Sequence, residues 1–377
     1  MAFCTSIWAG SAPRFSNGAA TFERVKSELL KHYYREGLSE EEIYQAAIRG
    51  LMKELDPDLS EWNSLLTPKE YGEMQSDLKG KIVGAGVEIR FEPQSGQSEV
   101  LYVVPDSPAE RAGVRRGDRI LSVDGRQYAG RTLAHVVEAI RGSEGDHRKL
   151  TLLRGDEVLT RRVVLTTIPF AEVTLNWPEK ETALITLNYF TQNTPGHLER
   201  VLNEVKKAKA LVLDLRGNMG GAFDSAVSSA SLLIPQGKPI VRLMKRGEKE
   251  EILRSSRNPI LSQIPSVVLI NEETTCAAEF LAMALKEQLG ATVVGAKSFG
   301  KWSMQKVETL GNDFAMKYTV GLFKSSEGKD LSGVGISPDV EVPLPKDQVR
   351  KLQRLSDIKA RLEQDAQLRA ALRVVKS

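Results

Sequence analysis

Cys276, one of two cysteines in the 377-residue chain, lies where a strand pattern passes into a helix pattern. The apolar run SVVLI, residues 266–270, predicts a buried strand, and helical spacing begins just after the cysteine. A thiolate at the start of a helix is stabilised by the helix dipole and by backbone N–H groups such as that of Ala277. Cys276 is therefore a candidate nucleophile, although the segment taken alone favours a buried cysteine that only fills space.

A second candidate site is the glycine-rich turn in LVLDLRGNMGGAF, residues 211–223. A buried strand runs into Gly217, Gly220 and Gly221 and then into a helix. Glycines at such a turn let backbone N–H groups point at a ligand, and the helix start adds positive potential. The residues leave two interpretations open, an oxyanion or anion site and a tight connection without chemistry.

A third candidate is Lys301, in the stretch GAKSFGKWSMQ at residues 295–305. A lysine held in a dry site loses its proton more easily and can act as a general base. Most lysines are solvated surface groups, so this stretch alone is weak evidence for catalysis.

Metal and nucleic-acid chemistry find no support in the composition. The chain has four histidines, none of which accompanies a cluster of Cys, Asp or Glu with ligand spacing: His32, His135, His147 and His197. The net charge is +3 on 52 basic and 49 acidic residues, which makes no case for nucleic-acid binding. No apolar run reaches the roughly 18 residues of a membrane-spanning helix. We expect no metal, no cofactor and no integral membrane segment.

The elements that must position these residues fall into a multidomain α+β pattern. Residues 20–78 read as a helical segment with a capping box and a proline-started helix. Residues 79–167 hold short strands separated by Gly, Asp and Pro, with one helix at 132–142, as in a small β-rich domain. Over residues 168–345 strands alternate with helices, which predicts a parallel sheet with crossover helices.

The two ends of the chain are predicted less sharply. Residues 346–377 read as a charged amphipathic helical tail, which fits an assembly element or a solvated tail equally well. Residues 1–19 read as a disordered tail or the remains of a signal peptide, since they hold a short apolar stretch but no basic region before it.

In their order along the chain, these stretches resemble peptidase family S41, the carboxyl-terminal processing or tail-specific proteases. The resemblance covers residues 21–343. It rests on ELDPDLSEWNSLLTPKEY, GAGVEI, VVPDSPAERAGVRRGDRILSVDGR, VLDLRGNMGG, VVLINEETTCAAEF, FGKWSMQ and GVGISPDVEV. It implies an N-terminal helical segment, a PDZ domain and a crotonase-like α/β catalytic domain.

The resemblance also implies roles for the candidate residues. In the family a serine attacks the peptide carbonyl, a lysine is the general base, and a glutamine near the lysine helps to position it. Aligned through Glu279, Cys276 stands at the serine position, and Lys301 follows it by 25 residues. Gln305 falls at the position of the glutamine.

The oxyanion hole of the family would be formed here by backbone N–H groups of Gly220 or Gly221 together with Ala277. Two further residues depart from the family pattern besides the cysteine. Met219 stands where proline is usual, which would loosen the turn, and Ala278 replaces a hydroxyl residue.

Cysteine in place of serine has two chemical consequences. A thiol needs less help from a base than an alcohol does, and a cationic Lys301 could hold it as a thiolate. Sulfur is also larger than oxygen, and small misplacements are costly in catalysis. Retention of Lys301, Gln305 and the double glycine favours an active Cys/Lys endopeptidase.

Three alternatives stay open. The first is a weak or inactive pseudoprotease that acts as a peptide-binding scaffold. The second is acyl transfer by a crotonase-like sheet, against which the PDZ segment argues. The third is an engineered Ser→Cys change in an ordinary serine protease.

The PDZ resemblance implies how substrates are selected. A PDZ domain takes a peptide C-terminus as an added strand, with the carboxylate on backbone N–H groups of a glycine-containing loop. Here that loop is Gly84, Ala85 and Gly86, followed by the strand from Val87 to Ile89. The expected partners are unfolded or C-terminally exposed proteins with apolar ends, and a homo-oligomer or an adaptor is possible. By resemblance the location is the cell envelope or periplasm, with the cytoplasm left open.

Overall fold

The computed structural model describes residues 17–54, 59, 62–92, 96–104, 106–128, 130–168, 171–261, 266–353, 355 and 357–376. The chain divides into two compact units. One holds residues 1–67 with 306–319, and the other holds residues 68–305 with 320–377. Most of the predicted tail at residues 1–19 lies outside the described residues. No helix in the described ranges is long and apolar enough to span a membrane.

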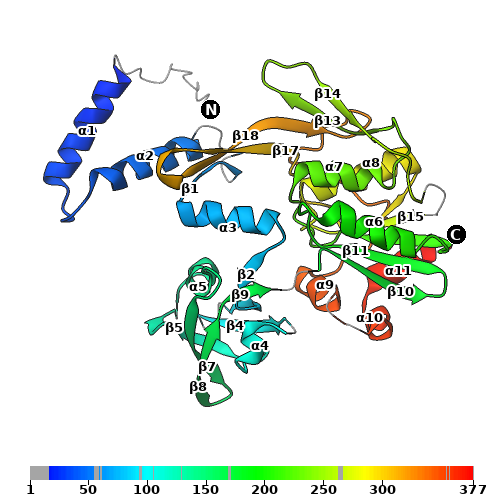
Figure 1. The fold of residues 1–377 in the computed structure, drawn as a ribbon, viewed down its shortest axis with the longest axis horizontal. Coiled ribbons are helices and arrows are strands. Elements are labelled where there is room, and N and C mark those ends of the chain that lie inside the picture. The colour runs from blue at the N-terminus through cyan, green and yellow to red at the C-terminus, as the bar shows by residue number, and fades with distance from the viewer. Residues whose placement is uncertain are drawn as a thin grey trace, which may run out of the picture. The chain divides into compact units, whose positions relative to one another are not determined.

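The first unit begins with two helices, α1 (Gly18–His32) and α2 (Glu40–Glu54), shown in blue in Figure 1. The predicted capping box at the start of α2 is confirmed, because Ser39 N donates to Glu42 Oε2 at 2.9 Å and Glu42 N donates to Ser39 Oγ at 3.1 Å. The sequence predicted a wholly helical segment, but the structure also contains a strand here. A strand, β1 (Ser64–Leu66), pairs antiparallel with residues 315–317 of β18 (Ala315–Lys324).

The β-rich domain follows helix α3 (Pro68–Leu78), which begins at the predicted proline. Its main sheet is antiparallel in the order β3-β4-β5-β7-β8, with β6 paired to β5, and β2 pairs separately with β9. The elements are β2 (Ile82–Gly84), β3 (Val87–Glu92), β4 (Gln97–Val103), α4 (Pro108–Arg111), β5 (Arg119–Val123), β6 (Arg126–Gln127), α5 (Leu133–Ile140), β7 (His147–Arg154), β8 (Glu157–Val164) and β9 (Thr166–Ile168). The predicted strands and the predicted helix of this domain are confirmed.

The predicted parallel sheet is also present. Its order is β10-β11-β12-β15-β16-β19, parallel from β11 to β19, with β10 as an antiparallel edge strand. The strands are β10 (Val173–Glu179), β11 (Thr182–Leu187), β12 (Ala210–Asp214), β15 (Ser266–Ile270), β16 (Thr292–Gly295) and β19 (Val340–Glu341), and the helices between them are α6 (Thr194–Glu204), α7 (Phe223–Ser231) and α8 (Ala277–Leu289). The central strands are apolar at nearly every position because both faces of the sheet are covered.

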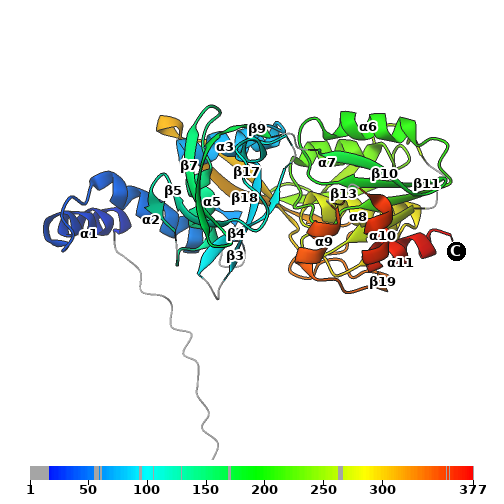
Figure 2. The ribbon, with the colours of Figure 1, turned by 90° about the horizontal axis from the view of Figure 1, so that it is seen from below.

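Alternate residues of these strands enter two different cores. Ile185, Leu213 and Val268 pack on the side of α6, α7 and α8. Leu184 and Val212, one residue away in their strands, pack on the opposite side with α11. Figure 2 shows the sheet between α6 and α7 on one face and α10 and α11 on the other.

The C-terminal residues therefore do not form a solvated tail. They fold into α9 (Lys346–Gln353), α10 (Ile358–Gln364) and α11 (Ala366–Val374). Leu368, Leu372 and Val375 are buried, at a spacing that places them on one face of the helix. That face covers the sheet. Many of the charged residues that suggested a tail lie on the outer face, whereas Arg361 and Asp365 are buried.

Strands that the sequence did not predict lie between the helices and after them. They include β10, β18 and β19, described above, together with β13 (Pro239–Lys245), β14 (Glu251–Arg254) and β17 (Ser303–Thr309), and a short 3-10 turn lies at Gly311–Asp313. β13 pairs antiparallel with β14 and with residues 321–324 of β18. β17 begins two residues after Lys301, so it fixes the position of that residue.

Candidate active site

Cys276 occupies a strained turn between β15 and α8. Its backbone has φ 57° and ψ −115°, a left-handed φ that is uncommon for a residue with a side chain. Two hydrogen bonds to the neighbouring turn hold it there. Thr274 Oγ1 donates to the Leu215 carbonyl at 2.9 Å, and Thr275 N donates to the Asn218 carbonyl at 2.9 Å. A sharp strand-to-helix turn of this kind presents a nucleophile at the end of a sheet.

Lys301, Gln305 and Ser303 lie beside the thiol. Lys301 Nζ donates to Gln305 Oε1 at 2.6 Å, and Gln305 Nε2 donates to Ser303 Oγ at 2.9 Å. The Cys276 sulfur lies 3.9 Å from the Ser303 carbonyl oxygen, at the range of a weak S–H donor. The structure thus brings the predicted nucleophile, base and glutamine to one place.

The charge state of the thiol follows from its surroundings. Burial raises the pKa of the Cys276 thiol above its ordinary value, and the nearby Lys301 ammonium and the N–H of Ala277 offset only part of this effect. The neutral thiol is therefore the main form at neutral pH. This direction disagrees with the expectation that a cationic Lys301 holds Cys276 as a thiolate.

The predicted oxyanion turn lies against the nucleophile. A Cβ atom at Gly220 would lie 3.1 Å from Cys276 Cβ and 3.2 Å from Ala277 N, so the turn approaches as closely as glycine permits. The N–H of Gly220 is already engaged, because it donates to Asn218 Oδ1 at 2.8 Å. Gly221 forms a parallel bridge with Phe190, which directs its own N–H away from that strand. Of the two glycines, Gly221 is thus the better candidate donor beside Ala277.

A buried ionic network anchors the strand that leads into this turn. Arg216 makes bidentate contacts with two carboxylates, Asp214 at 2.8 and 2.9 Å and Asp365 at 2.9 Å for both bonds. Arg361 Nη2 adds a bond to Asp214 at 2.6 Å, and Gln367 Oε1 accepts from Arg216 at 2.9 Å. The four charged side chains are at most 2% exposed. Residues of α10 and α11 therefore complete the charge balance at the base of the catalytic turn.

Glu279 is a buried residue beside the candidate dyad, and at the level of the sequence it served only for alignment. It accepts four hydrogen bonds, and those from the N–H groups of Cys276 and Lys301 go to the same oxygen, Oε2, each at 2.9 Å. Burial raises the pKa of this carboxyl, although its four donors favour the charged form. A sequence signal was present, since a glutamate three residues after a helix cap is typical of a capping box.

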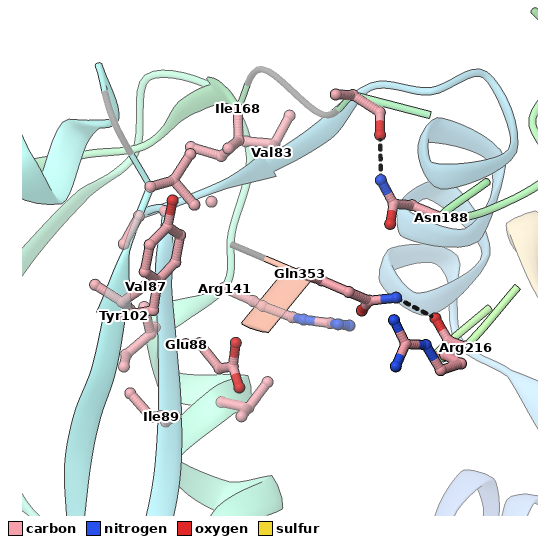
Figure 3. A pocket seen from close by; sticks show the side chains of 18 residues that line it. Val83, Val87, Glu88, Ile89, Tyr102, Arg141, Ile168, Asn188, Arg216 and Gln353 are labelled. Carbon is pink, nitrogen blue, oxygen red and sulfur yellow. Dashed lines mark hydrogen bonds between the residues drawn. The ribbon is translucent and has the colours of Figure 1, made fainter. Parts of the chain in front are cut away.

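The predicted peptide-binding loop lines a cavity of about 800 Å³ (Figure 3). Its loop conformation depends on Gly86, whose φ is +78° and where a Cβ would lie 2.2 Å from Ser107 Cβ. The carbonyl oxygens of the loop are engaged, since Ala85 O accepts from Ala109 N at 2.8 Å and Gly86 O accepts from Val104 N at 2.9 Å. The lining is mainly apolar and includes Val83, Val87, Ile89, Val137, Ile140 and Ile168. Such a lining suits an apolar peptide end.

Comparison with known proteins agrees with this arrangement. Residues 99–154 match the model of a PDZ domain, and residues 181–342 match the model of peptidase family S41. A Staphylococcus epidermidis protein described as a "probable CtpA-like serine protease" is 32% identical over 331 residues, which are 86% of this chain and 66% of that protein. The chain belongs to peptidase family S41. It spans slightly less than two thirds of the length of that relative.

Other S41 proteins extend the comparison. A Staphylococcus aureus protein with the same description is 33% identical over 330 residues, covering 86% of this chain and 65% of that protein. The solved photosystem II D1 C-terminal processing protease has a TM-score of 0.56 and 28% identity, covering 86% of this chain and 88% of that one. The predicted multidomain α+β architecture, with N-terminal helices, a PDZ domain and an S41 domain, is confirmed.

Proposed function

We propose that this S41 chain is an endopeptidase that binds exposed, apolar protein C-termini through its PDZ domain and cleaves peptide bonds with Cys276. The observation that carries the proposal is the convergence of three side chains from two separate segments. A thiol on a strained turn, the Lys301 amine and the Gln305 amide lie together at the end of a parallel sheet. This is the arrangement that nucleophilic attack with proton transfer requires.

The reaction would proceed in two steps. The sulfur of Cys276 bonds to the carbonyl carbon while its proton passes to Lys301, which has to have given up its own proton before this step. Lys301 then gives that proton to the leaving nitrogen as the C–N bond breaks, which leaves a thioester. Water, deprotonated by Lys301, attacks the thioester, and the C–S bond breaks to release the acid and restore the thiol.

The surrounding groups support these steps. Gln305 Oε1 accepts from Lys301 Nζ and so orients the amine towards the thiol. The N–H of Ala277 acts on the sulfur and favours negative charge there. With Gly221 as a second donor, these backbone groups would stabilise the oxyanion of the tetrahedral intermediate. Because the thiol is mainly neutral at rest, we assign Lys301 the role of base rather than that of a permanent counter-ion.

A peptide-binding scaffold without turnover is the second candidate, and two observations favour it. The N–H of Gly220 is engaged by Asn218, and burial raises the pKa of Cys276. Both would lower the rate of attack without affecting the PDZ cavity. The relatives are described as serine proteases, so a thiol in this position would be a departure from their chemistry.

Cleavage of an unfolded model protein would separate the two. The parent chain is compared with Cys276→Ala, Cys276→Ser and Lys301→Ala. We expect turnover by the parent and its loss in the Cys276→Ala and Lys301→Ala variants. A silent parent with an active Cys276→Ser variant would mean a serine protease disarmed at its nucleophile. Silence in all four chains, with C-terminal peptides still bound, would favour the scaffold.

The setting of the protein stays a prediction. The cell envelope or periplasm is expected from the family resemblance, and a homo-oligomer or an adaptor partner is possible. The reaction as written uses only side chains and backbone groups of this chain, so it calls for no cofactor.

A further inference from the structure

Helix α8 carries two buried glutamates with different surroundings. Glu279, in its first turn, is completely buried. Its Oε1 accepts from Ser298 Oγ at 2.6 Å and from Gly300 N at 2.7 Å. Its Oε2 accepts from the backbone N–H groups of Cys276 and Lys301, each at 2.9 Å. One carboxylate thus satisfies four donors from two chain segments.

The two bonds to Oε2 have a geometric consequence. The main chain of the nucleophile and the main chain of the base are each one hydrogen bond away from the same atom. Cys276 and Lys301 belong to different segments, one at the start of α8 and one in the loop before β17. They are 25 residues apart in the chain, so their separation depends on contacts between the two segments. The shared acceptor is one of these contacts, and the bond from Phe299 N to the Thr274 carbonyl at 3.1 Å is another.

The bonds to Oε1 extend this anchor. Ser298 Oγ also accepts from Ile336 N at 2.7 Å, and Ser298 N donates to the Ile336 carbonyl at 3.1 Å. The loop that carries Lys301 is therefore held on one side by Glu279 and on the other by the segment near Ile336. Removing the carboxylate would leave the side that faces Cys276 with fewer bonds, chiefly the one from Phe299 N to the Thr274 carbonyl.

We propose that Glu279 is a positioning residue that sets the separation between Cys276 and Lys301 by accepting the backbone N–H groups of both. The proposal deepens the proposed function and rests on it for its catalytic consequence. Glu279 touches no substrate in this scheme. It acts through the two residues that do.

Glutamine at position 279 tests this geometry because it has nearly the same shape. An amide has one acceptor oxygen and one NH₂ group, and the four groups around Glu279 are donors. If the NH₂ faces Cys276 and Lys301, both of their N–H groups lose their acceptor. If it faces Ser298 and Gly300, the hydroxyl can turn to accept but the Gly300 N–H cannot. Either orientation leaves at least one buried donor without an acceptor, which is unfavourable.

Glu287 supplies a matched control on the same helix. Its side chain is 2% exposed and accepts from Ser325 Oγ at 2.8 Å, Ser326 Oγ at 2.5 Å and Glu327 N at 3.0 Å. It accepts three hydrogen bonds, against four at Glu279, and forms an ion pair with Lys329 at 3.1 Å, but it contacts neither Cys276 nor Lys301 in the described structure. A purely structural effect of losing a buried carboxylate would therefore appear at both positions.

The experiment is a double-mutant cycle on the pH profile of Cys276 alkylation by iodoacetamide, read by peptide mapping. The chains of the first cycle are the parent, Lys301→Met, Glu279→Gln and the double variant. A second cycle, in which Glu287→Gln replaces Glu279→Gln, is the control. A cycle is needed because the charge of Glu279 itself raises the pKa of the thiol. We expect Lys301→Met to move the alkylation midpoint to higher pH in the parent and in Glu287→Gln. In the Glu279→Gln background, the shift caused by Lys301→Met should be less than half of the shift in the parent.

An unchanged Lys301→Met shift in the Glu279→Gln background would overturn the proposal. Alkylation requires no turnover, so a chain that cleaves nothing but shows the expected cycle would refute the endopeptidase and leave the positioning role standing. If turnover is present, we also expect kcat of Glu279→Gln to fall by about 100-fold with KM within about twofold, since small misplacements of reacting groups have effects of that size. Thermal melting shows which variants are folded. Glu279→Asp, which keeps the charge but withdraws it by one methylene, replaces Glu279→Gln if the latter does not fold.

Discussion

Cys276 differs from a solvent-exposed cysteine in two opposing ways. Burial disfavours its charged form, while Lys301 and the N–H of Ala277 favour it, and burial has the larger effect. As the proposed nucleophile, Cys276 would gain its charge during the reaction, in contrast to a preformed thiolate. This property can be measured without knowing the natural substrate.

The pH dependence of Cys276 alkylation should show this directly. Because the pKa of the thiol is raised in the folded chain, the thiolate fraction and the alkylation rate should keep rising as pH increases. We expect the midpoint to lie above the value of about 8.5 that is typical of a free cysteine. The same cysteine in the urea-denatured chain, mapped to the same peptide, provides the reference. A folded-state midpoint below pH 7 would contradict the expected direction and would restore the thiolate ion pair.

At the scale of the element, the PDZ cavity depends on the loop between β2 and β3. Gly86 has a left-handed backbone and no room for a side chain. Two carbonyl groups of the loop are bound by the segment that runs from β4 to α4. The loop is therefore a rigid frame, and its remaining N–H groups are the ones available to a peptide carboxylate.

Gly86→Ala should weaken the binding of peptides with apolar C-termini by at least about 10-fold. A Cβ at this position would lie 2.2 Å from Ser107 Cβ, so the loop must shift. Gly117→Ala is the matched control, since its φ of +88° imposes a similar backbone strain of about 1–2 kcal/mol but nothing lies within 4 Å of its Cβ position. Binding is measured by fluorescence anisotropy with free and amidated peptide ends. Equal affinity of the two variants would remove this loop from the binding site.

At the scale of the whole molecule, the C-terminal helices are part of the catalytic unit. Their apolar residues cover the second face of the parallel sheet, and Arg361 and Asp365 enter the buried network with Arg216. Burial alone would raise the pKa of Asp214, but Arg216 and Arg361 outweigh it and lower that pKa to about 2. A depressed carboxyl pKa stabilises the fold above the unfolded value of about 3.9, and this contribution is lost as pH falls towards 2.

Arg361→Met should lower the free energy of unfolding by about 3–5 kcal/mol at pH 7, because it leaves two buried carboxylates with a single arginine. Urea denaturation of the folded chain measures the loss. Arg373→Met, on the exposed side of α11, is the control and should change stability little. The difference between parent and Arg361→Met should narrow below about pH 4 as the carboxylates become protonated. Equal losses in the two variants would show that the network adds nothing specific.

The sequence by itself determined the order of the domains, the parallel sheet and the identity of the candidate dyad. Each of these follows from a local pattern of the sequence. The patterns are the alternation of strands and helices, the glycines at turns and the fixed order of the motifs. The strands β1, β13, β14, β17 and β18 were not predicted. Their pairing, in which β13 pairs with β14 and β18 pairs with β1, β13 and β17, is a tertiary feature that the local patterns did not indicate. The C-terminal helices were misjudged because their surface charge is visible in the sequence, while the sheet face that accepts their apolar side is not.

Only the tertiary structure decided what surrounds the chemistry. The protonated state of Cys276 depends on how deeply the folded chain buries it. The engagement of the Gly220 N–H depends on the side chain of Asn218, and the network around Arg216 joins residues 214 and 365, which are far apart in the chain. The double role of Glu279 Oε2 requires that two loops meet at one oxygen. Such contacts arise from the packing of distant segments, and for that reason no local pattern contains them.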